Sequence, residues 1–469
     1  MPGKFKIVVS DLHLSAGRIS EGNPLEDFAS DGEFAALVDG IIAESDREGA
    51  EVELILNGDA FEMLQVPHVT EFDPAAEYPP EQYHSSSEED SALKMAVIID
   101  GHRPFFDALG RFLRVGPPCR TVTFIKGNHD LNLHWDAVQA AIRDALGAIS
   151  RRQSLVTFEE RRISREGIYV EHGNQYAEGV DRVEDMEEPH DHDDPLQLAL
   201  PLGSWFVMDV FNKLEREKYW IDGVKPITAL IWYAVKFDFG FALRAIARLS
   251  GSLPSVLWQG LRTTESPEAE VMDGGEQDEP RIEELAERYE SDPEFRAEFN
   301  SQLAELLGTP VEEEGGRGIE DVDDPVEMGD RVRALVRSSL YDMAAARAAE
   351  EGVRLVTFGH THDAGVEELP GGGTYINSGT WTWRADFGSS GKETWQMLFL
   401  HPERFTEDRT LSYVRIDYDD EGQPSGQLMC YEAGARGMSP GAINQGDSSI
   451  WHRLEGWLRK LAGVVGIDV

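Results

Sequence analysis

Short apolar runs alternate with amphipathic stretches through the first third of the chain. Four apolar runs predict strands, at 5–9, 52–56, 121–125 and 167–170. Three stretches with apolar residues at helical spacing predict helices, near 31–47, 91–115 and 135–146. Proline- and serine-rich sequence from 67 to 90 predicts a loop. Strands that alternate with helices in this way are typical of an α/β core.

After residue 352 the pattern changes to a series of short apolar runs. Five of them predict strands, at 355–358, 374–376, 395–400, 411–416 and 427–430. Near the C-terminus, apolar residues between 450 and 465 recur at helical spacing, with basic side chains close by, and predict an amphipathic helix. This helix is expected to pack against the domain. Alternatively, it would contact a membrane surface or a helix of a partner.

The segment 176–345 separates these two parts and is longer than a connection requires. Its first part, 196–261, is rich in aromatic residues, and its later part, 263–330, is acidic and contains glycine. The aromatic part predicts several helices that form either a packed core or a groove for a ligand. The chain therefore divides into four regions: a core 1–175, an insertion and candidate cap 176–345, a second core part 346–432, and a tail 433–469.

The charge of the chain argues against one class of partner. Its 469 residues include 87 acidic and 43 basic side chains, for a net charge of -44. Nucleic acid is therefore not an expected partner, because binding to its phosphates needs lysine and arginine. Adaptation of the surface to high salt would account for the excess acid, and so would a disordered acidic stretch.

Cysteine content and the N-terminus bear on the location of the protein. Cys119 and Cys430 lie far apart in the sequence, and a reducing cytosol is the simplest setting for them. Met1 is followed closely by the first predicted strand, which leaves no room for a signal peptide. No apolar run reaches the ~18 residues of a membrane-spanning helix. These features predict a cytoplasmic protein, with the inner face of the membrane as a second possible location.

Five polar motifs each follow directly on a predicted strand. They are Asp11-Leu12-His13, Gly58-Asp59, Gly127-Asn128-His129-Asp130, His172-Gly173 and Gly359-His360-Thr361-His362. Their carboxylate, amide and imidazole groups are mixed oxygen and nitrogen donors that suit a first-row divalent ion. Five such loops indicate two adjacent ions that share a carboxylate and clamp a displacement at phosphorus. Where two donors lie two residues apart, an extended strand end is expected to project both to one side, with Leu12 turned into the core.

The order of these motifs resembles the pattern of the calcineurin-like metallophosphoesterase superfamily, which runs D-x-H, G-D, G-N-H-[ED], H and G-H-x-H. The resemblance covers residues 4–179 and 353–419. It implies an α/β (α+β) fold: a metallophosphoesterase-type β-sandwich flanked by helices, here with a large helical insertion and a C-terminal helix. It also implies two divalent metal ions. Manganese is the favoured metal, and iron, zinc and magnesium are alternatives.

The same resemblance implies a set of metal ligands. They are Asp11, His13 and His362 for the first ion, Asn128, His172 and His360 for the second, and Asp59 as the bridge between the two. Four positive charges on the ions would exceed the charge of the two carboxylates, so the site would attract a phosphate oxyanion. A water or hydroxide held between the ions is the implied nucleophile.

Two residues of the third motif are implied to take part in catalysis. His129 is expected to assist the leaving oxygen as an acid, and Asp130 is expected to orient His129. Asn57, Glu62 and Asn174 are candidate partners that hold the metal ligands in place.

Around the first two motifs, in 10–14 and 57–62, the sequence is similar to the UDP-2,3-diacylglucosamine pyrophosphatase branch of this superfamily. Enzymes of that branch hydrolyse a pyrophosphate in a lipid A precursor and hold its acyl chains with a helical insert. This chain departs from them in three ways: His129 stands where arginine is usual, Asn174 stands where aspartate is usual, and the chain is much longer. The resemblance is therefore to a relative of that branch rather than to a member of it.

These features predict a dinuclear metallophosphoesterase that hydrolyses a lipid-linked or nucleotide-linked (pyro)phosphate. Peripheral membrane contact through the insertion or the C-terminal helix would accompany a lipid-linked substrate. One alternative is a soluble phosphodiesterase or phosphatase for small nucleotides, and another is a metal-bound scaffold without catalysis. Residues 190–194 (His-Asp-His-Asp-Asp) predict a solvated acidic loop rather than a metal cluster, and 377–381 resemble the family turn that supports the GHTH loop.

Overall fold

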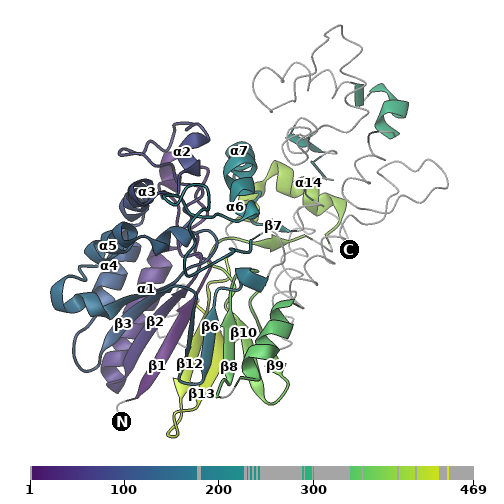
Figure 1. Ribbon diagram of the computed structural model, residues 1–469. Helices are drawn as coiled ribbons and strands as arrows, with labels where there is room; N and C mark the ends of the chain where they lie inside the picture. The colour runs from purple at the N-terminus through teal and green to yellow at the C-terminus, as the bar shows by residue number, and fades with distance from the viewer. Residues whose placement is uncertain are drawn as a thin grey trace.

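Two β-sheets and the helices around them make up most of the described part of the chain (Figure 1). The computed structural model describes residues 3–176, 181–225, 339–350, 352–387, 390–406, 409–431 and 441–442, together with 230, 233–234, 237–238, 241–242, 288–289, 291–297 and 299. Most of the tail 433–469 and most of 226–338 lie outside the described residues, as do Trp232 and Trp258.

The first sheet combines parallel and antiparallel strands. Its order is β14 (Gly441–Ala442), β13 (Pro424–Cys430), β12 (Ser412–Tyr418), β1 (Lys4–Val9), β2 (Glu51–Asn57), β3 (Arg120–Ile125) and β4 (Val156–Glu159). Strands β1 to β4 run parallel, and β12 to β14 pair antiparallel. The parallel strands bring the ends of β1, β2 and β3 to one edge of the sheet.

The second sheet is also mixed. Its order is β5 (Arg162–Arg165), β6 (Ile168–Glu171), β8 (Leu355–Phe358), β10 (Gly373–Asn377) and β9 (Gly365–Leu369). Strands β6, β8 and β10 are parallel, although β6 and β8 are separated by the whole insertion. Two further strands, β7 (Val224–Lys225) and β11 (Ala385–Asp386), form a small separate pair.

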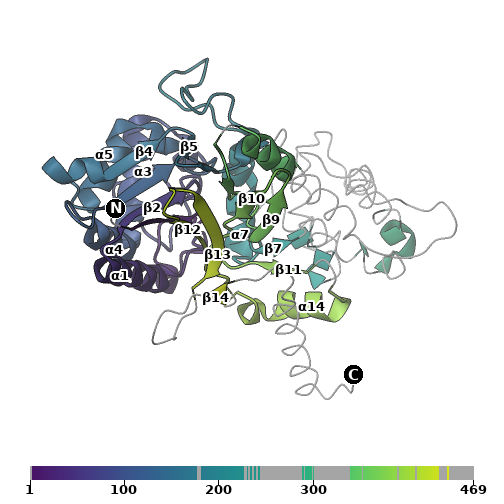
Figure 2. The same ribbon diagram turned by 90° about the horizontal axis from the view of Figure 1, so that it is seen from below.

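Alternate residues of β1 face opposite layers of the fold. Ile7 and Val9 belong to a large core under the helices, while Val8 belongs to a second core with Val170 and Ile376 of the other sheet. The helices over the first sheet are α1 (Asp31–Glu48), α3 (Glu88–Gly101), α4 (Arg103–Phe112) and α5 (Asp136–Ala145). Figures 1 and 2 show them together on the side of this sheet away from β8 and β10.

The outer face of the second sheet is covered by another helical segment. Residues 339–348 are helical, and Leu340 and Ala344 pack with Val356 and Phe358 of β8. Two sheets packed face to face between helices make a mixed α/β structure of the α+β type. The layered arrangement that the sequence predicts is confirmed at this level.

The described part of the insertion includes α6 (Leu202–Phe206), the π-helical turn η5 (Val207–Phe211) and α7 (Asn212–Glu217). Its aromatic side chains divide into two groups. Trp220, Tyr233 and Phe237 pack in a core with α14 (Lys392–Leu400), whereas Trp205 is 41% exposed and Phe206 is 36% exposed. A packed core is therefore the correct interpretation for the first group but not for the second.

Three element predictions are wrong. Residues 395–400 form the end of helix α14 rather than a strand: Trp395 and Leu398, three positions apart, are buried on one face, while Leu400 is 63% exposed. The helix near 91–115 is two helices, since the chain breaks at His102 and Pro104 lacks the N–H that a continuous helix would need there. The stretch 67–90 is not entirely loop, because it contains α2 (Glu81–His84) and the start of α3.

The other predicted strands, and the helices predicted near 31–47 and 135–146, are confirmed to within a few residues. The helix predicted between 450 and 465 lies outside the described residues. In the described part of the chain, none of the helices combines the length and the apolar composition that crossing a bilayer requires.

Candidate metal centre

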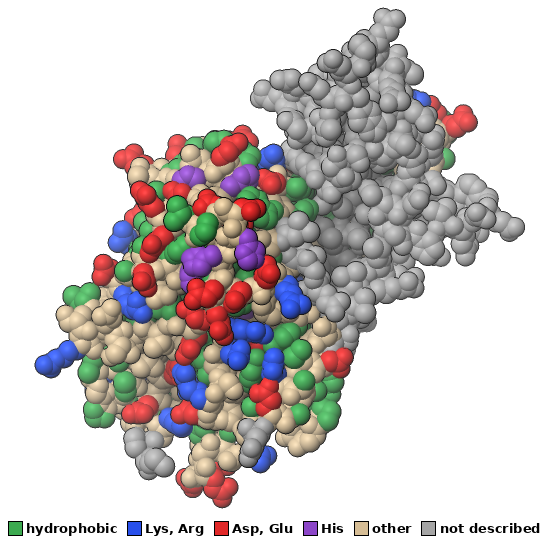
Figure 3. Space-filling model, in the orientation of Figure 1, with side chains coloured by type: hydrophobic (Ala, Val, Ile, Leu, Met, Phe, Trp, Pro, Cys, Tyr) green, Lys and Arg blue, Asp and Glu red, His purple; other side chains and the backbone are tan. Residues whose placement is uncertain are grey.

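The five polar motifs meet at the carboxyl ends of β1, β2, β3, β6 and β8. Three groups of three side chains place their donor atoms within 4.8 Å of one another: Asp11, His13 and His362 in the first, Asp59, His172 and His360 in the second, and His13, Asp59 and His129 in a third that overlaps both. The first group is the predicted set for the first ion, and the second contains two predicted ligands of the second ion together with the predicted bridge, Asp59. On the face shown in Figure 3, histidine side chains reach the surface among acidic ones.

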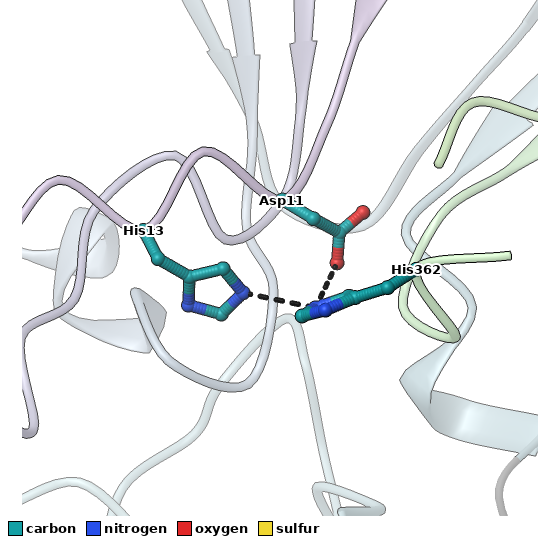
Figure 4. A group of neighbouring side chains, drawn as sticks. All are labelled: Asp11, His13 and His362. Carbon is teal, nitrogen blue, oxygen red and sulfur yellow. Dashed lines mark hydrogen bonds and ion pairs between the residues drawn. The ribbon is translucent and has the colours of Figure 1, made fainter. Parts of the chain in front are cut away.

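In the first group the three side chains point toward one another (Figure 4). His13 Nε2 lies 3.1 Å from His362 Nε2, and His362 Nε2 lies 3.4 Å from Asp11 Oδ1. The other ring nitrogen of His13, Nδ1, is 2.8 Å from Glu62 Oε2. An ionised carboxylate only accepts hydrogen bonds, so His13 Nδ1 carries the hydrogen and Nε2 of the neutral ring presents its lone pair to the group.

The second group is arranged in the same way. His172 Nδ1 donates to the carbonyl oxygen of Asn57 at 3.0 Å, which leaves a lone pair on Nε2 of the neutral ring. That atom lies 3.0 Å from Asp59 Oδ2 but makes no hydrogen bond in the structure. Two electron-pair donors at this separation suit a cation held by both of them.

Two further observations fit metal ions at this place. The side-chain oxygen of Asn128, Oδ1, is buried without a hydrogen-bond partner. Asp59 Oδ2 also lies 4.0 Å from His13 Nε2, so this carboxylate faces the first group as well as the second. The residues present fit two divalent ions with Asp59 between them, and the mixed donors suit a first-row metal.

The backbone at the ligands is left-handed rather than extended. Positive φ angles occur at Asp11 (52°), His13 (51°), Asp59 (48°), His360 (67°) and His362 (61°). This conformation costs a non-glycine residue roughly 1–2 kcal/mol, and such strain often gathers at functional sites. The prediction that extended strand ends project the paired donors is therefore wrong, although Leu12 is buried as expected.

Three glycines of the motifs make room for ligands from neighbouring loops. A Cβ on Gly58 would lie 2.4 Å from the His172 ring. On Gly127 it would lie 2.0 Å from Asp59 Oδ1, and on Gly359 it would lie 2.4 Å from Asp11 Oδ2. Each glycine therefore permits a contact that any side chain would block.

The charges within the centre favour ionised carboxylates. Burial alone would raise the pKa of Asp59, but the nearby His172 and His129 outweigh it and hold this pKa well below its usual value. Burial would lower the pKa of His172, but Asp59 and Asp11 raise it to about 9. For His360, burial and the charge of His172 together lower the pKa to about 4. Protons and metal ions therefore compete for the same histidine nitrogens.

The ring of His129 is held by Glu62 and not by Asp130. His129 Nδ1 lies 2.6 Å from Glu62 Oε2, the oxygen that also accepts from His13. Asp130 instead accepts from the backbone N–H groups of Gly127 at 2.7 Å and of Ala60 at 2.8 Å. The prediction that Asp130 orients His129 is wrong: this carboxylate ties the second motif loop to the third.

Glu62 therefore holds the rings of both His13 and His129. The sequence indicated it only as a candidate partner of the metal ligands. Glu62 is buried, and although burial raises its pKa, the charges of His129 and His13 and its hydrogen bonds to them lower it to about 2. Its position three residues after Asp59 is a signal that could have marked it. Of the other candidate partners, Asn57 holds His172 through its backbone carbonyl, and Asn174 donates to the backbone of Asp181.

Two residues near the centre were not predicted from the sequence. Asp181 Oδ2 lies 3.7 Å from His360 Nε2. Arg384 donates to the carbonyl of Thr361 at 3.1 Å and pairs with Asp363 at 2.7 Å, so it supports the loop between His360 and His362. Neither residue belongs to a recognisable motif.

Beside the centre, three carboxylates lie together, from Asp27, Glu215 and Asp222. Burial and the charges of its two neighbours raise the pKa of Glu215 well above its usual value. The side-chain amide of Gln65 donates to Glu215. This group joins the N-terminal part of the core to helix α7 and the loop that follows it.

No protein-family model matches the chain, and no curated protein is similar to it in sequence. The geometry of the centre therefore carries the argument about function.

Proposed function

We propose that the protein is a dinuclear metal-dependent phosphoester hydrolase of the calcineurin-like metallophosphoesterase type. The observation that carries the proposal is the position of Asp59 between two groups of donors, each with two histidines, of which His13 and His172 keep an Nε2 lone pair toward the group. The two sheets packed face to face between helices support the same family of folds. All seven predicted ligands are present, which argues against a scaffold that has lost catalysis.

The roles of the ligands follow from the geometry. Asp11, His13 and His362 would hold one ion, and Asn128, His172 and His360 the other, with Asp59 shared. When bound, such ions polarise a phosphoryl oxygen and lower the pKa of water. Glu62 fixes the His13 ring through Nδ1, and the Asn57 carbonyl fixes the His172 ring. These bonds keep Nε2 of both rings aimed at the centre before substrate arrives.

His129 is placed to assist the leaving oxygen. Its backbone N–H donates to Asp59 Oδ1 at 2.9 Å, and its Nδ1 is bonded to Glu62, so Nε2 is the ring position that remains for a substrate. A proton delivered from Nε2 would neutralise the departing oxygen as the bond to phosphorus breaks.

One observation favours a substrate with an apolar part. The hydroxyl of Ser204, in helix α6 of the insertion, lies 3.5 Å from the backbone carbonyl of Asn128. The next two residues, Trp205 and Phe206, have partly exposed aromatic side chains. A lipid-linked (pyro)phosphate would place its apolar part on them. A small nucleotide remains the alternative substrate, since it would need no such surface.

The test compares metal-stripped protein with protein reloaded with manganese or zinc. Substrates are a nitrophenyl phosphomonoester, a bis-nitrophenyl phosphodiester, and UDP-linked pyrophosphates with and without acyl chains. Asp59→Asn should lose both bound ions and turnover, whereas Asp39→Asn, at an exposed carboxylate, should lose neither. If reloaded protein hydrolyses none of these, or if Asp59→Asn retains two ions and full turnover, the proposal fails.

The variant His129→Ala tests separately whether His129 acts as an acid. Metal content should stay the same while kcat falls by ~10²–10⁴-fold. The loss should be smaller for nitrophenol esters, whose leaving groups need little protonation. An equal loss for good and poor leaving groups would contradict the role as an acid.

A further inference from the structure

His134 and His190 come together on the side of the core where the insertion begins. His134 is the last residue of η2 (Leu131–His134), shortly after the third motif, and His190 lies in the described segment 181–225. Their Nε2 atoms are 3.3 Å apart, and their ring planes are nearly perpendicular, at 84°. Glu188 Oε2 lies 3.8 Å from His190 Nε2, and all three donors are within 4.8 Å of one another.

The hydrogen-bond partners of the two rings decide where their lone pairs point. His190 Nδ1 is 3.1 Å from the carbonyl oxygen of Pro195. A carbonyl oxygen only accepts, so this nitrogen carries the hydrogen and Nε2 of the neutral ring has the lone pair. His134 Nδ1 is buried and makes no hydrogen bond, and Glu160 Oε2, an acceptor when ionised, lies 3.6 Å from it. With its hydrogen on that side, His134 too presents a lone pair at Nε2.

Two lone pairs that face each other at 3.3 Å repel unless a cation lies between them. A Zn²⁺ ion bound at about 2.0–2.1 Å to two nitrogens in tetrahedral geometry holds them about 3.3 Å apart. The bond from His190 Nδ1 to the Pro195 carbonyl is also typical of a metal-binding histidine, whose second nitrogen donates to a carbonyl or a carboxylate. Glu160 is itself anchored, because Lys126 pairs with it and also donates to the carbonyl of Met186 at 2.6 Å.

We propose that His134, His190 and Glu188 form a further divalent-metal site, suited to zinc, that is separate from the candidate metal centre. The two histidine Nε2 atoms and a carboxylate oxygen of Glu188 supply three ligands, and solvent completes the coordination. Glu188 is 77% exposed in its side chain and can close the remaining distance by a change of rotamer. The proposal does not depend on the proposed function.

The site would tie the insertion to the core. Val183, Met186 and Leu198, which flank His190 in the chain, pack on Leu131 of η2. Asp181, at the start of the same segment, lies beside His360 of the candidate metal centre. An ion on His134 and His190 would therefore hold this segment in place next to that centre, and its role is structural.

The experiment counts bound zinc per chain by elemental analysis of the full-length protein, after stripping and reloading with zinc alone. It uses the wild type and Asp59→Asn, so that ions in the candidate metal centre are counted separately. In both backgrounds His190→Ala should lose one bound zinc ion per chain. His192→Ala is the matched control, because this histidine of the same loop is 88% exposed in its side chain and should keep the full count.

His190→Ala could lose zinc because it misfolds, so a second variant with a milder change is also measured. Glu188→Gln changes a mostly exposed side chain, and it should weaken zinc binding by at least the ~10-fold that follows loss of an outer partner of a metal ligand. The proposal is overturned if His190→Ala binds as much zinc as the wild type, or if His192→Ala loses as much as His190→Ala. It is also overturned if Glu188→Gln leaves the zinc affinity unchanged, because Glu188 would then not be a ligand.

Discussion

Replacing Gly127 by alanine should damage the candidate metal centre through clashes with one residue, Asp59. A Cβ at this position would lie 2.0 Å from Asp59 Oδ1 and 2.6 Å from the backbone nitrogen of Asp59. The φ angle of Gly127 lies outside the left-handed region, so alanine meets no backbone strain there. The effect of the change is therefore a displacement of Asp59.

The size of that displacement follows from the structure. Asp59 Oδ1 must move by about 1.4 Å to reach the 3.4 Å of ordinary contact. The carboxylate cannot simply rotate away, because Oδ1 accepts from the backbone of His129 and Oδ2 faces His172. A misplacement of ~1 Å at a reacting site can cost ~10²-fold in rate, and an overpacked buried site costs typically ~1–3 kcal/mol of stability.

The assay measures bound manganese per chain, turnover of a bis-nitrophenyl phosphodiester, and the free energy of unfolding in urea. Gly127→Ala should bind fewer ions and lose about 10²-fold in kcat/KM. Gly32→Ala, in helix α1, is the control: a Cβ there meets nothing within 4 Å, and alanine should stabilise by up to ~1 kcal/mol. Two bound ions and unchanged turnover in Gly127→Ala would refute the reasoning.

Glu62→Gln should weaken metal binding by ~10–100-fold and lower kcat, because a neutral amide oxygen holds the His13 and His129 rings less strongly than the charged carboxylate does; wild-type affinity and turnover would contradict this. Glu215→Gln should stabilise the protein at neutral pH. The raised pKa of Glu215 means that the folded state holds a proton which the unfolded state releases, so stability falls as pH rises above ~4.3. The glutamine keeps an acceptor for Gln65, and denaturant midpoints that fall equally with pH in both proteins would argue against it. If the acidic surface is an adaptation to salt, the melting temperature should rise between ~0.1 M and ~1 M salt, as the Debye length shrinks from ~10 Å to ~3 Å; a flat or falling value would remove that hypothesis.

Local patterns in the sequence determined most of the secondary structure. Apolar runs predict the strands before each motif, and helical spacing predicts α1 and α5, because both signals repeat within one element. The pattern failed where it was ambiguous. The run 395–400 is apolar except for Gln396, and a short run of this kind suits a strand or a buried helix equally.

The sequence by itself also determined which side chains line the candidate metal centre. Donor residues directly after parallel strands must come together, because the ends of such strands share an edge. Only the tertiary structure decided how those donors are supported. The bond from His129 to Glu62 rather than to Asp130, the left-handed ligand backbones, and the approach of His134 to His190 all depend on distances between loops far apart in the chain. A local pattern in the sequence does not predict such distances, because they depend on how the layers of the fold pack together.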